Sequence, residues 1–271
     1  MAWGAMILKM HAFPPSWIQP DWPAPKNVRA IMTTREGGVS LTPWDSMNLG
    51  DHVGDLHEKV QLNRALLQDR MQKQAVFLQQ VHGLEVVSLT LDTAHGVQAD
   101  ACWTTSSERA CTVMVADCLP VLLCDASGRW VAAAHAGWRG LAGVQGRGIL
   151  EALVSRLPLS EDNLPSVMAW LGPCIGPQAF EVGQEVRSAF DDGSPEVSAL
   201  FAPLPGGKFL ADLAGLARRR LRSLGIHQVY GNDSQLPWCT ASQSALFFSH
   251  RRDSRVLGQT GRMAACIWLE A

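Results

Sequence analysis

Three short, almost uninterrupted apolar segments lie close together in the middle of the chain, at Cys111–Val115, Val121–Cys124 and Trp130–Ala134. Strands that are apolar on both faces are typical of sheets covered on both sides. Each such strand therefore needs a further layer above and below it, and this constrains the fold more than any other feature. Further strands are predicted at Val28–Thr34 and Met263–Leu269.

Helical patterns are mixed irregularly with these strands. Apolar residues at helical spacing predict helices over Glu58–Met71 and over Leu210–Leu224, the second ended by Gly225. We also expect a helix over Trp138–Leu157, despite its glycines, and a strand over Ala245–Ser249. Because strands and helices do not alternate strictly, the expected fold is an α+β layered sandwich with a mixed sheet.

The composition is that of a folded globular chain. Apolar residues make up 47% and charged residues 18% of the 271 residues, which excludes a disordered chain. A formal net charge of −2 gives no electrostatic attraction to nucleic acid or to a membrane surface. Seven cysteines without a C-x-x-C motif indicate a reducing compartment. We therefore expect one cytoplasmic domain over residues 1–271, with an irregular N-terminal segment over 1–25 and an oligomeric state that the sequence leaves open.

Reactive side chains follow three of the expected strands, namely His82, Cys118 and His135. Strand ends are rigid, and the loops beyond them leave room for a ligand. Two imidazoles and one thiolate suit zinc, and three protein ligands leave a fourth position open, as in catalytic zinc sites. The separations match no local zinc motif, and a lone histidine or cysteine is more often a packed residue. From spacing alone the group therefore remains a hypothesis about the fold.

Sequence-local motifs of other enzyme classes are absent. The chain has no H-E-x-x-H, no H-x-E paired with P-C-x-x-C, no G-x-x-x-x-G-K-[ST] and no G-x-S-x-G. These absences lower the expectation of a metalloprotease, a deaminase of the usual scaffold, a nucleotide triphosphatase or an α/β-hydrolase.

Ten segments together resemble one known family. They are TTREGGVS (33–40), NLGDHVGD (48–55), NRALL (63–67), QVHG (80–83), ADACWT (99–104), VADCLPVLL (115–123), AAAHAGWRGLAGV (132–144), LGPCIGPQAFEVG (171–183), FFSHRRD (247–253) and TGRMA (260–264). The chain is similar to the YfiH-like family, also called laccase-domain or peptidoglycan-editing-factor proteins and regarded as zinc purine nucleoside phosphorylases. The ADCLP and HAGWRG pair is highly specific. The first 25 residues lie outside the resemblance, and the segment after Arg252 is somewhat longer than expected.

The resemblance implies both a site and an activity. It implies that His82, Cys118 and His135 bind Zn²⁺ and carry the chemistry. It implies phosphorolysis of adenosine, inosine and 5′-methylthioadenosine, with adenosine deamination as a side activity, so a purine nucleoside and phosphate would be the small-molecule partners. It also implies a layered α/β/β/α sandwich of YfiH-like type.

Candidate residues for binding and proton transfer follow from this chemistry. Arginine gives phosphate bidentate contacts, which makes Arg35 and Arg139 the candidates, with Arg251 and Arg252 weaker ones. Asn48 could bond the ribose or the base, and Phe180 or Trp138 could stack on the purine. Asp117, beside Cys118, is a catalytic candidate for moving protons, although it could equally cap a turn. Cys174, in a stiff Gly-Pro-Cys-Ile-Gly-Pro loop, could line the site or pack a turn.

Three other classes of protein are alternatives to the phosphorylase. Two histidines and a cysteine could hold Cu²⁺ in a copper polyphenol oxidase, but only eight histidines are present, with no H-x-H pair. Cys118 could instead be the nucleophile of a cysteine hydrolase that edits peptidoglycan precursors, with His82 or His135 as its base. A binding protein without enzymatic activity is the third and least favoured alternative, because the three reactive groups would then have no function.

Overall fold

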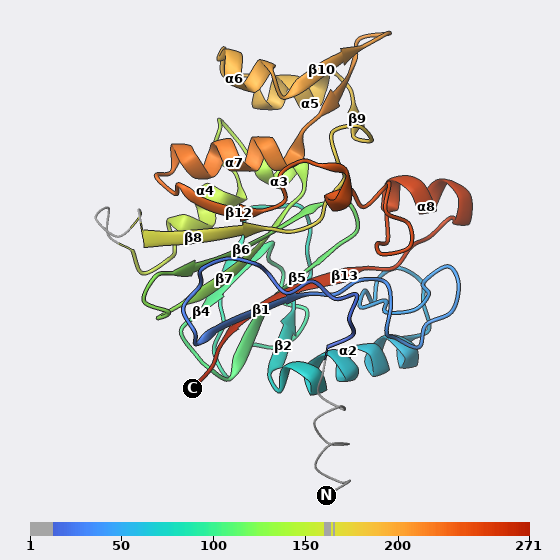
Figure 1. The fold of residues 1–271 in the computed structure, drawn as a ribbon, viewed down its shortest axis with the longest axis vertical. Helices are drawn as coiled ribbons and strands as arrows, with labels where there is room; N and C mark the ends of the chain where they lie inside the picture. The colour runs from blue at the N-terminus through green and yellow to red at the C-terminus, as the bar shows by residue number, and fades with distance from the viewer. Residues whose placement is uncertain (1–12, 160–163, 165) are drawn as a thin grey trace, which may run out of the picture.

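The computed structural model describes residues 13–159, 164 and 166–271, and its strands form three sheets (Figure 1). The strands are β1 (Val28–Met32), β2 (Gln74–Phe77), β3 (Val86–Ser88), β4 (Ala101–Thr104), β5 (Arg109–Val115), β6 (Leu119–Asp125), β7 (Val131–Ala136), β8 (Val167–Leu171), β9 (Glu181–Val182), β10 (Phe201–Leu204), β11 (Lys208–Ala211), β12 (Gln228–Gly231) and β13 (Met263–Leu269). The helices are α2 (His57–Met71), α3 (Trp138–Ala142), α4 (Ile149–Val154), α5 (Gln184–Phe190), α6 (Pro195–Ser198), α7 (Leu213–Ser223), η2 (Leu236–Trp238) and α8 (His250–Leu257).

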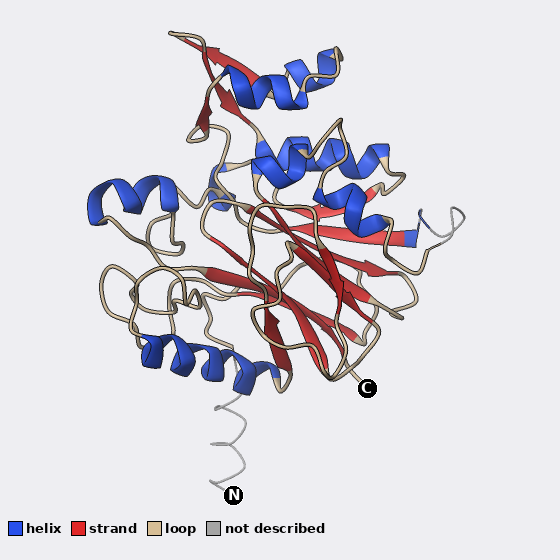
Figure 2. Ribbon diagram, turned by 180° about the vertical axis from the view of Figure 1, so that it is seen from behind, coloured by secondary structure: helices blue, strands red, loops and turns tan. Residues whose placement is uncertain are grey.

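Two larger sheets lie face to face, and helices cover both outer faces (Figure 2). One sheet has the strand order β1-β13-β5-β2, the other the order β12-β8-β6-β7-β4-β3. Both contain parallel and antiparallel pairs, such as β2 parallel to β5 and β6 antiparallel to β7. Helix α2 packs on the four-stranded sheet, and α3, α4 and α7 pack on the six-stranded sheet. This order of layers confirms the expected α+β sandwich.

Strand β6 shows why the central segments are apolar on both faces. Leu119, Val121 and Leu123 pack against the helical layer, whereas Leu122 and Cys124 pack against the four-stranded sheet. All seven residues of β6 are buried. The strand is therefore held from both sides, and its first residue directly follows Cys118.

The predictions of two elements were wrong. The helix expected over Trp138–Leu157 is divided into α3 and α4, because Gly143 has φ +64° and a Cβ there would lie 1.9 Å from the carbonyl oxygen of Arg147. Residues Ala245–Ser249 form no strand; they lead into α8, where the Ser249 side chain accepts a hydrogen bond from the backbone N–H of Arg252.

The start of the described chain carries little regular structure. Within residues 13–25, a single bridge joins Ile18 to Met32, and residues 1–12 of the expected irregular segment lie outside the described residues. No helix in the described ranges is long and apolar enough to cross a membrane. The single domain and the cytoplasmic location stay predictions.

Candidate active site

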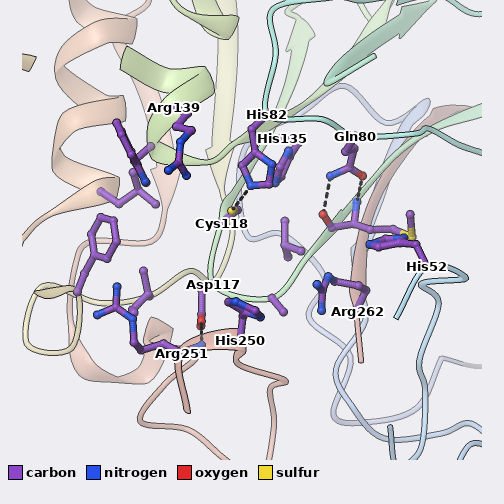
Figure 3. Close-up of a pocket in the computed structure, with 17 residues that line it drawn as sticks. His52, Gln80, His82, Asp117, Cys118, His135, Arg139, His250, Arg251 and Arg262 are labelled. Carbon is purple, nitrogen blue, oxygen red and sulfur yellow. Dashed lines mark hydrogen bonds between the residues drawn. The ribbon is translucent and has the colours of Figure 1, made fainter. Parts of the chain in front are cut away.

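His82, Cys118 and His135 are far apart in the sequence but lie close together in the structure (Figure 3). Their possible ligand atoms all lie within 4.8 Å of one another, and Cys118 Sγ is 3.6 Å from His82 Nε2. His82 lies in the turn after β2, and Cys118 ends the loop between β5 and β6. His135 lies within β7, opposite Pro120 of β6, so strand pairing itself brings it near Cys118.

Asp100 holds both histidines and was not identified from the sequence. Its fully buried carboxylate accepts hydrogen bonds from the backbone N–H groups of Val81, His82 and Gly83 at 3.1, 2.9 and 2.7 Å. These bonds stabilise the turn in which His82 has φ +59°, a conformation that costs energy for a residue other than glycine. The carboxylate also bonds Nδ1 of His135 at 2.8 Å.

Charges around this group favour an ionised carboxylate and an ionised thiol. Burial alone would raise the pKa of Asp100, but hydrogen bonds from His135 and from the backbone lower it. Since an ionised carboxylate only accepts hydrogen bonds, Nδ1 of His135 must carry the proton, which leaves Nε2 for the cluster. Burial would likewise raise the pKa of Cys118, yet His135 and His82 lower it to about 6. For His135, burial lowers the pKa, and the opposing effects of Cys118 and Asp100 raise it to about 9.

Gly137 leaves space for the side chains of His82 and Cys118 to approach each other. A Cβ at Gly137 would lie 2.7 Å from Cδ2 of His82 and 3.0 Å from Sγ of Cys118. At Gly140, in α3, a Cβ would lie 3.3 Å from the carbonyl oxygen of Gly83. The glycines after His135 therefore let α3 pack closely on the turn that carries His82.

The donor set fits a zinc ion. Two imidazole nitrogens and a thiolate sulfur are preferred zinc ligands, and three protein ligands leave a position for water or substrate. The lowered pKa of Cys118 favours the thiolate that a metal requires, and Asp100 orients His135 so that Nε2 faces the cluster, where a metal would displace its proton. The same set also fits copper, so the donors do not decide which metal is bound.

The cluster opens into a cavity of about 420 Å³. The residues that line it are His52, Gln80, His82, Met114, Val115, Ala116, Asp117, Cys118, His135, Trp138, Arg139, Ile175, Phe180, Leu213, His250, Arg251 and Arg262. Asp117 is the sole carboxylate among them, against three arginines. Such a cavity suits an anionic ligand that also carries a flat apolar part.

Only some of the predicted binding residues reach this cavity. Arg139 and Phe180 line it, as do Trp138 and Arg251. The guanidinium of Arg139 stacks on the Trp138 ring at 4.5 Å, and that of Arg251 on the Phe180 ring at 5.7 Å. Stacked arginines beside aromatic rings form a wall on which a purine could lie.

Four other candidates do not line the cavity. Arg35 lines a separate pocket, where it bonds Asp45, and its guanidinium lies over the ring of the buried Phe248. Asn48 is fully buried, and its side chain bonds its own loop and the backbone N–H of Arg262. Cys174 is buried in the turn and accepts a hydrogen bond from Asn232, so it fits turn packing. The guanidinium of Arg252 donates to the carbonyl groups of residues 240, 241 and 247. The binding of substrate by these four residues stays a prediction from the sequence.

Asp117 lines the cavity, and both oxygens of its carboxylate accept hydrogen bonds from the protein. It accepts hydrogen bonds from Oγ1 of Thr240 at 2.6 Å, from Oγ of Ser249 at 3.1 Å and from the backbone N–H of Arg251 at 2.6 Å. These bonds join the loop of Cys118 to the start of α8. The geometry favours the turn-capping alternative for Asp117, and its role in proton transfer stays a prediction.

Sequence reasoning missed Gln80, His52, His250 and Arg262 at the cavity. Gln80 donates to the carbonyl of Met114 and accepts from its N–H, both at 2.7 Å, and so joins the His82 turn to the end of β5. The segments NLGDHVGD, FFSHRRD and TGRMA contained the other three residues, but only the fold places these segments together.

Known proteins resemble the chain over nearly its whole length. The sequence model of a family described as multi-copper polyphenol oxidoreductase laccase matches residues 29–270. A protein of Pseudomonas aeruginosa named purine nucleoside phosphorylase is 49% identical over 256 residues, which cover 94% of this chain and 99% of the relative. The purine nucleoside phosphorylase YfiH of Escherichia coli is 48% identical over 254 residues, which cover 93% and 98%.

Solved structures agree with the fold. The crystal structure of a Neisseria meningitidis protein assigned to DUF152 has a TM-score of 0.86 and 44% sequence identity, and it covers 94% of this chain and 100% of that chain. YlmD of Geobacillus stearothermophilus has a TM-score of 0.83 and 30% identity, with 96% and 98% covered.

Proposed function

The chain belongs to the laccase-like family that includes the YfiH and DUF152 proteins, and from this premise we propose that it is a zinc-dependent purine nucleoside phosphorylase. Its proposed substrates are adenosine, inosine and 5′-methylthioadenosine with phosphate, and adenosine deamination is the proposed side activity. Relatives named purine nucleoside phosphorylase support this type of enzyme.

One observation carries the proposal: a cluster of two histidines and a cysteine opens into a cavity with an aromatic wall and an excess of arginines. In phosphorolysis, a phosphate oxygen forms a bond to C1′ of the ribose while the bond from C1′ to the base breaks, so the base leaves and a sugar 1-phosphate forms. The enzyme must hold an anion and a flat base side by side while positive charge develops on the sugar. The cavity provides groups for both.

The chain's own residues would act by binding and orientation. Trp138 and Phe180 provide apolar rings for the base, and the positive charge in the cavity favours an anion such as phosphate. Zinc held by His82, Cys118 and His135 would supply a Lewis acid. Asp100 would keep both histidines in place.

An assay of base release tests this function. Purified protein is incubated with each nucleoside, with and without phosphate, and the free base is measured by chromatography. We expect phosphate-dependent release by the wild type and a loss of at least about 100-fold in Cys118→Ala and His135→Ala. His227→Ala, at an exposed position that does not line the cavity, is the matched control. Equal release by all four proteins would refute the site.

The description of the family favours copper as a second candidate, because two imidazoles and one thiolate also form part of blue-copper sites. Stoichiometric copper in the purified protein, with phenol oxidation proportional to it, would support an oxidase. Zinc at one per chain without phenol oxidation would exclude it.

The imidazoles around Cys118 keep the cysteine hydrolase as a third candidate, because they also suit a thiol nucleophile. A hydrolase of this kind keeps its activity when a chelator removes the metal. Loss of base release on chelation, with recovery on adding zinc, would instead support the metal enzyme.

A further inference from the structure

The arginines of the cavity lie on two different sides of the cluster (Figure 3). Arg139 and Arg251 lie on one side, each stacked on an aromatic ring. Arg262 lies on the other side, next to His52 and away from the aromatic wall. The two sides therefore offer different surroundings to a ligand: one has aromatic rings beneath its arginines, and the other has Arg262 beside His52.

Arg262 is held in place by the loop that contains Asn48 and Gly50. Oδ1 of Asn48 accepts the backbone N–H of Arg262 at 2.9 Å, and the carbonyl of Arg262 accepts the N–H of Leu49 at 3.0 Å. Its side-chain stem crosses Gly50, where a Cβ would lie 2.7 Å from Cγ of Arg262. The NLG sequence thus shapes the position of one arginine, although Asn48 itself does not reach the cavity.

The guanidinium of Arg262 is oriented on one edge and free on the other. Nη1 donates to the carbonyl groups of Thr260 and Gly261 at 3.2 and 3.1 Å. Nε and Nη2 have no hydrogen-bond partner, and no carboxylate pairs with Arg262, within the part of the chain that the structure describes. Burial lowers the pKa of Arg262, whereas nearby Cys118 and Asp117 raise it; arginine stays charged at neutral pH.

We propose that Arg262, with His52 beside it, forms the subsite for the phosphate co-substrate, on the side of the cluster opposite Trp138 and Phe180. This inference rests on the proposed function. A free edge of a charged guanidinium, fixed by its other edge, matches a phosphate with two parallel hydrogen bonds. The base then lies on the aromatic side, and C1′ of the nucleoside lies between the two, near the cluster. Asn48 and Gly50 are positioning residues for Arg262.

The test compares arginines on the two sides by the same change. Arg262→Gln, Arg139→Gln and Arg251→Gln each remove one charge, and initial rates are measured with phosphate varied at saturating inosine and with inosine varied at saturating phosphate. For Arg262→Gln we expect the KM for phosphate to rise by roughly 10- to 100-fold, with the KM for inosine changed less than about threefold. For the other two we expect mainly the KM for inosine to rise.

Two further variants separate charge from geometry. Arg262→Lys keeps the charge without the paired donors and should recover part of the phosphate affinity. Gly50→Ala keeps Arg262, but the added methyl group collides with the aliphatic part of the Arg262 side chain. This variant should raise the KM for phosphate at least about fivefold. Thermal denaturation identifies any variant that fails to fold. If Arg262→Gln does not fold, the KM of Gly50→Ala for phosphate tests the subsite in its place.

Direct binding distinguishes the failure of this inference from the failure of the proposed function. Isothermal titration of the zinc-loaded protein with inorganic phosphate should show binding to the wild type that Arg262→Gln weakens, whatever reaction the enzyme catalyses. A wild type without phosphate-dependent base release would refute the phosphorylase alone. Phosphate binding unchanged in Arg262→Gln, or weakened as much by Arg139→Gln, would overturn the subsite.

Discussion

Asp100 joins the two histidines of the cluster to one carboxylate. It fixes the tautomer of His135 and the left-handed turn of His82 at the same time. Side chains that hold metal ligands in this way commonly change metal affinity when they are replaced. The positions of the ligands thus depend on a buried residue that does not itself touch the proposed ion.

Replacing Asp100 should therefore weaken metal binding. An amide at this position places N–H groups against N–H donors, so in Asp100→Asn we expect zinc affinity to fall by about 10- to 100-fold. Competition with a chromophoric chelator measures the affinity. Asp125→Asn, which changes a buried carboxylate at the end of β6, is the control and should keep wild-type affinity. Wild-type affinity in Asp100→Asn would refute this role.

Gly137 tests whether the packing of the cluster matters for the metal. In Gly137→Ala the added methyl group would occupy the space between His82 and Cys118, and we expect zinc affinity and base release to fall at least about tenfold. Gly83→Ala is the matched control, since its Cβ meets only ordinary contacts of 3.4 and 3.5 Å with Val81 and Asp100. A similar zinc affinity in both variants would contradict the steric explanation.

At the scale of elements, the hairpin of β6 and β7 joins two of the proposed ligands. Cys118 precedes β6, His135 lies in β7, and Asp125 closes the connection between them. The buried carboxylate of Asp125 accepts the backbone N–H groups of Arg129 and Trp130 at 2.7 and 3.3 Å. Burial would raise the pKa of Asp125, but hydrogen bonds from Ser127, Arg129 and Trp130 lower it.

The lowered pKa of Asp125 makes its contribution to stability depend on pH. A carboxyl whose folded-state pKa is lowered stabilises the fold fully above its ordinary pKa of about 4, and this contribution is lost as the pH falls through the folded-state pKa. We expect Asp125→Asn to lower the free energy of unfolding by about 1–3 kcal/mol at pH 7. Urea denaturation should show a smaller difference from the wild type at pH 3. An unchanged difference would refute the assignment.

For the whole molecule, the layered fold could be predicted because its signals are local. The apolar strands around Val121, the strand Met263–Leu269 and the helix Glu58–Met71 each carry their pattern within a few residues. The helix expected over Trp138–Leu157 was wrong, since the left-handed conformation of Gly143 depends on contact with residue 147. Propensity alone does not distinguish a tolerated glycine from one that ends a helix.

The site could be predicted only in part from the sequence. The chemistry of His82, Cys118 and His135, together with the family resemblance, led to the cluster that the fold brings together. Arg35 and Asn48 stand in equally conspicuous motifs, yet their polar groups bond neighbouring protein atoms. Whether a polar side chain faces a ligand or the protein depends on contacts between distant segments, which neither spacing nor residue type reveals.

The claim on which the whole account depends is that a thiolate and two imidazoles bind one zinc ion. X-ray absorption at the zinc edge on purified protein measures this directly. We expect about one zinc per chain, with one sulfur at about 2.3 Å and two nitrogens at about 2.0–2.1 Å, and no sulfur in Cys118→Ala. A wild-type protein without a stoichiometric metal, or a metal shell lacking sulfur, would contradict the account.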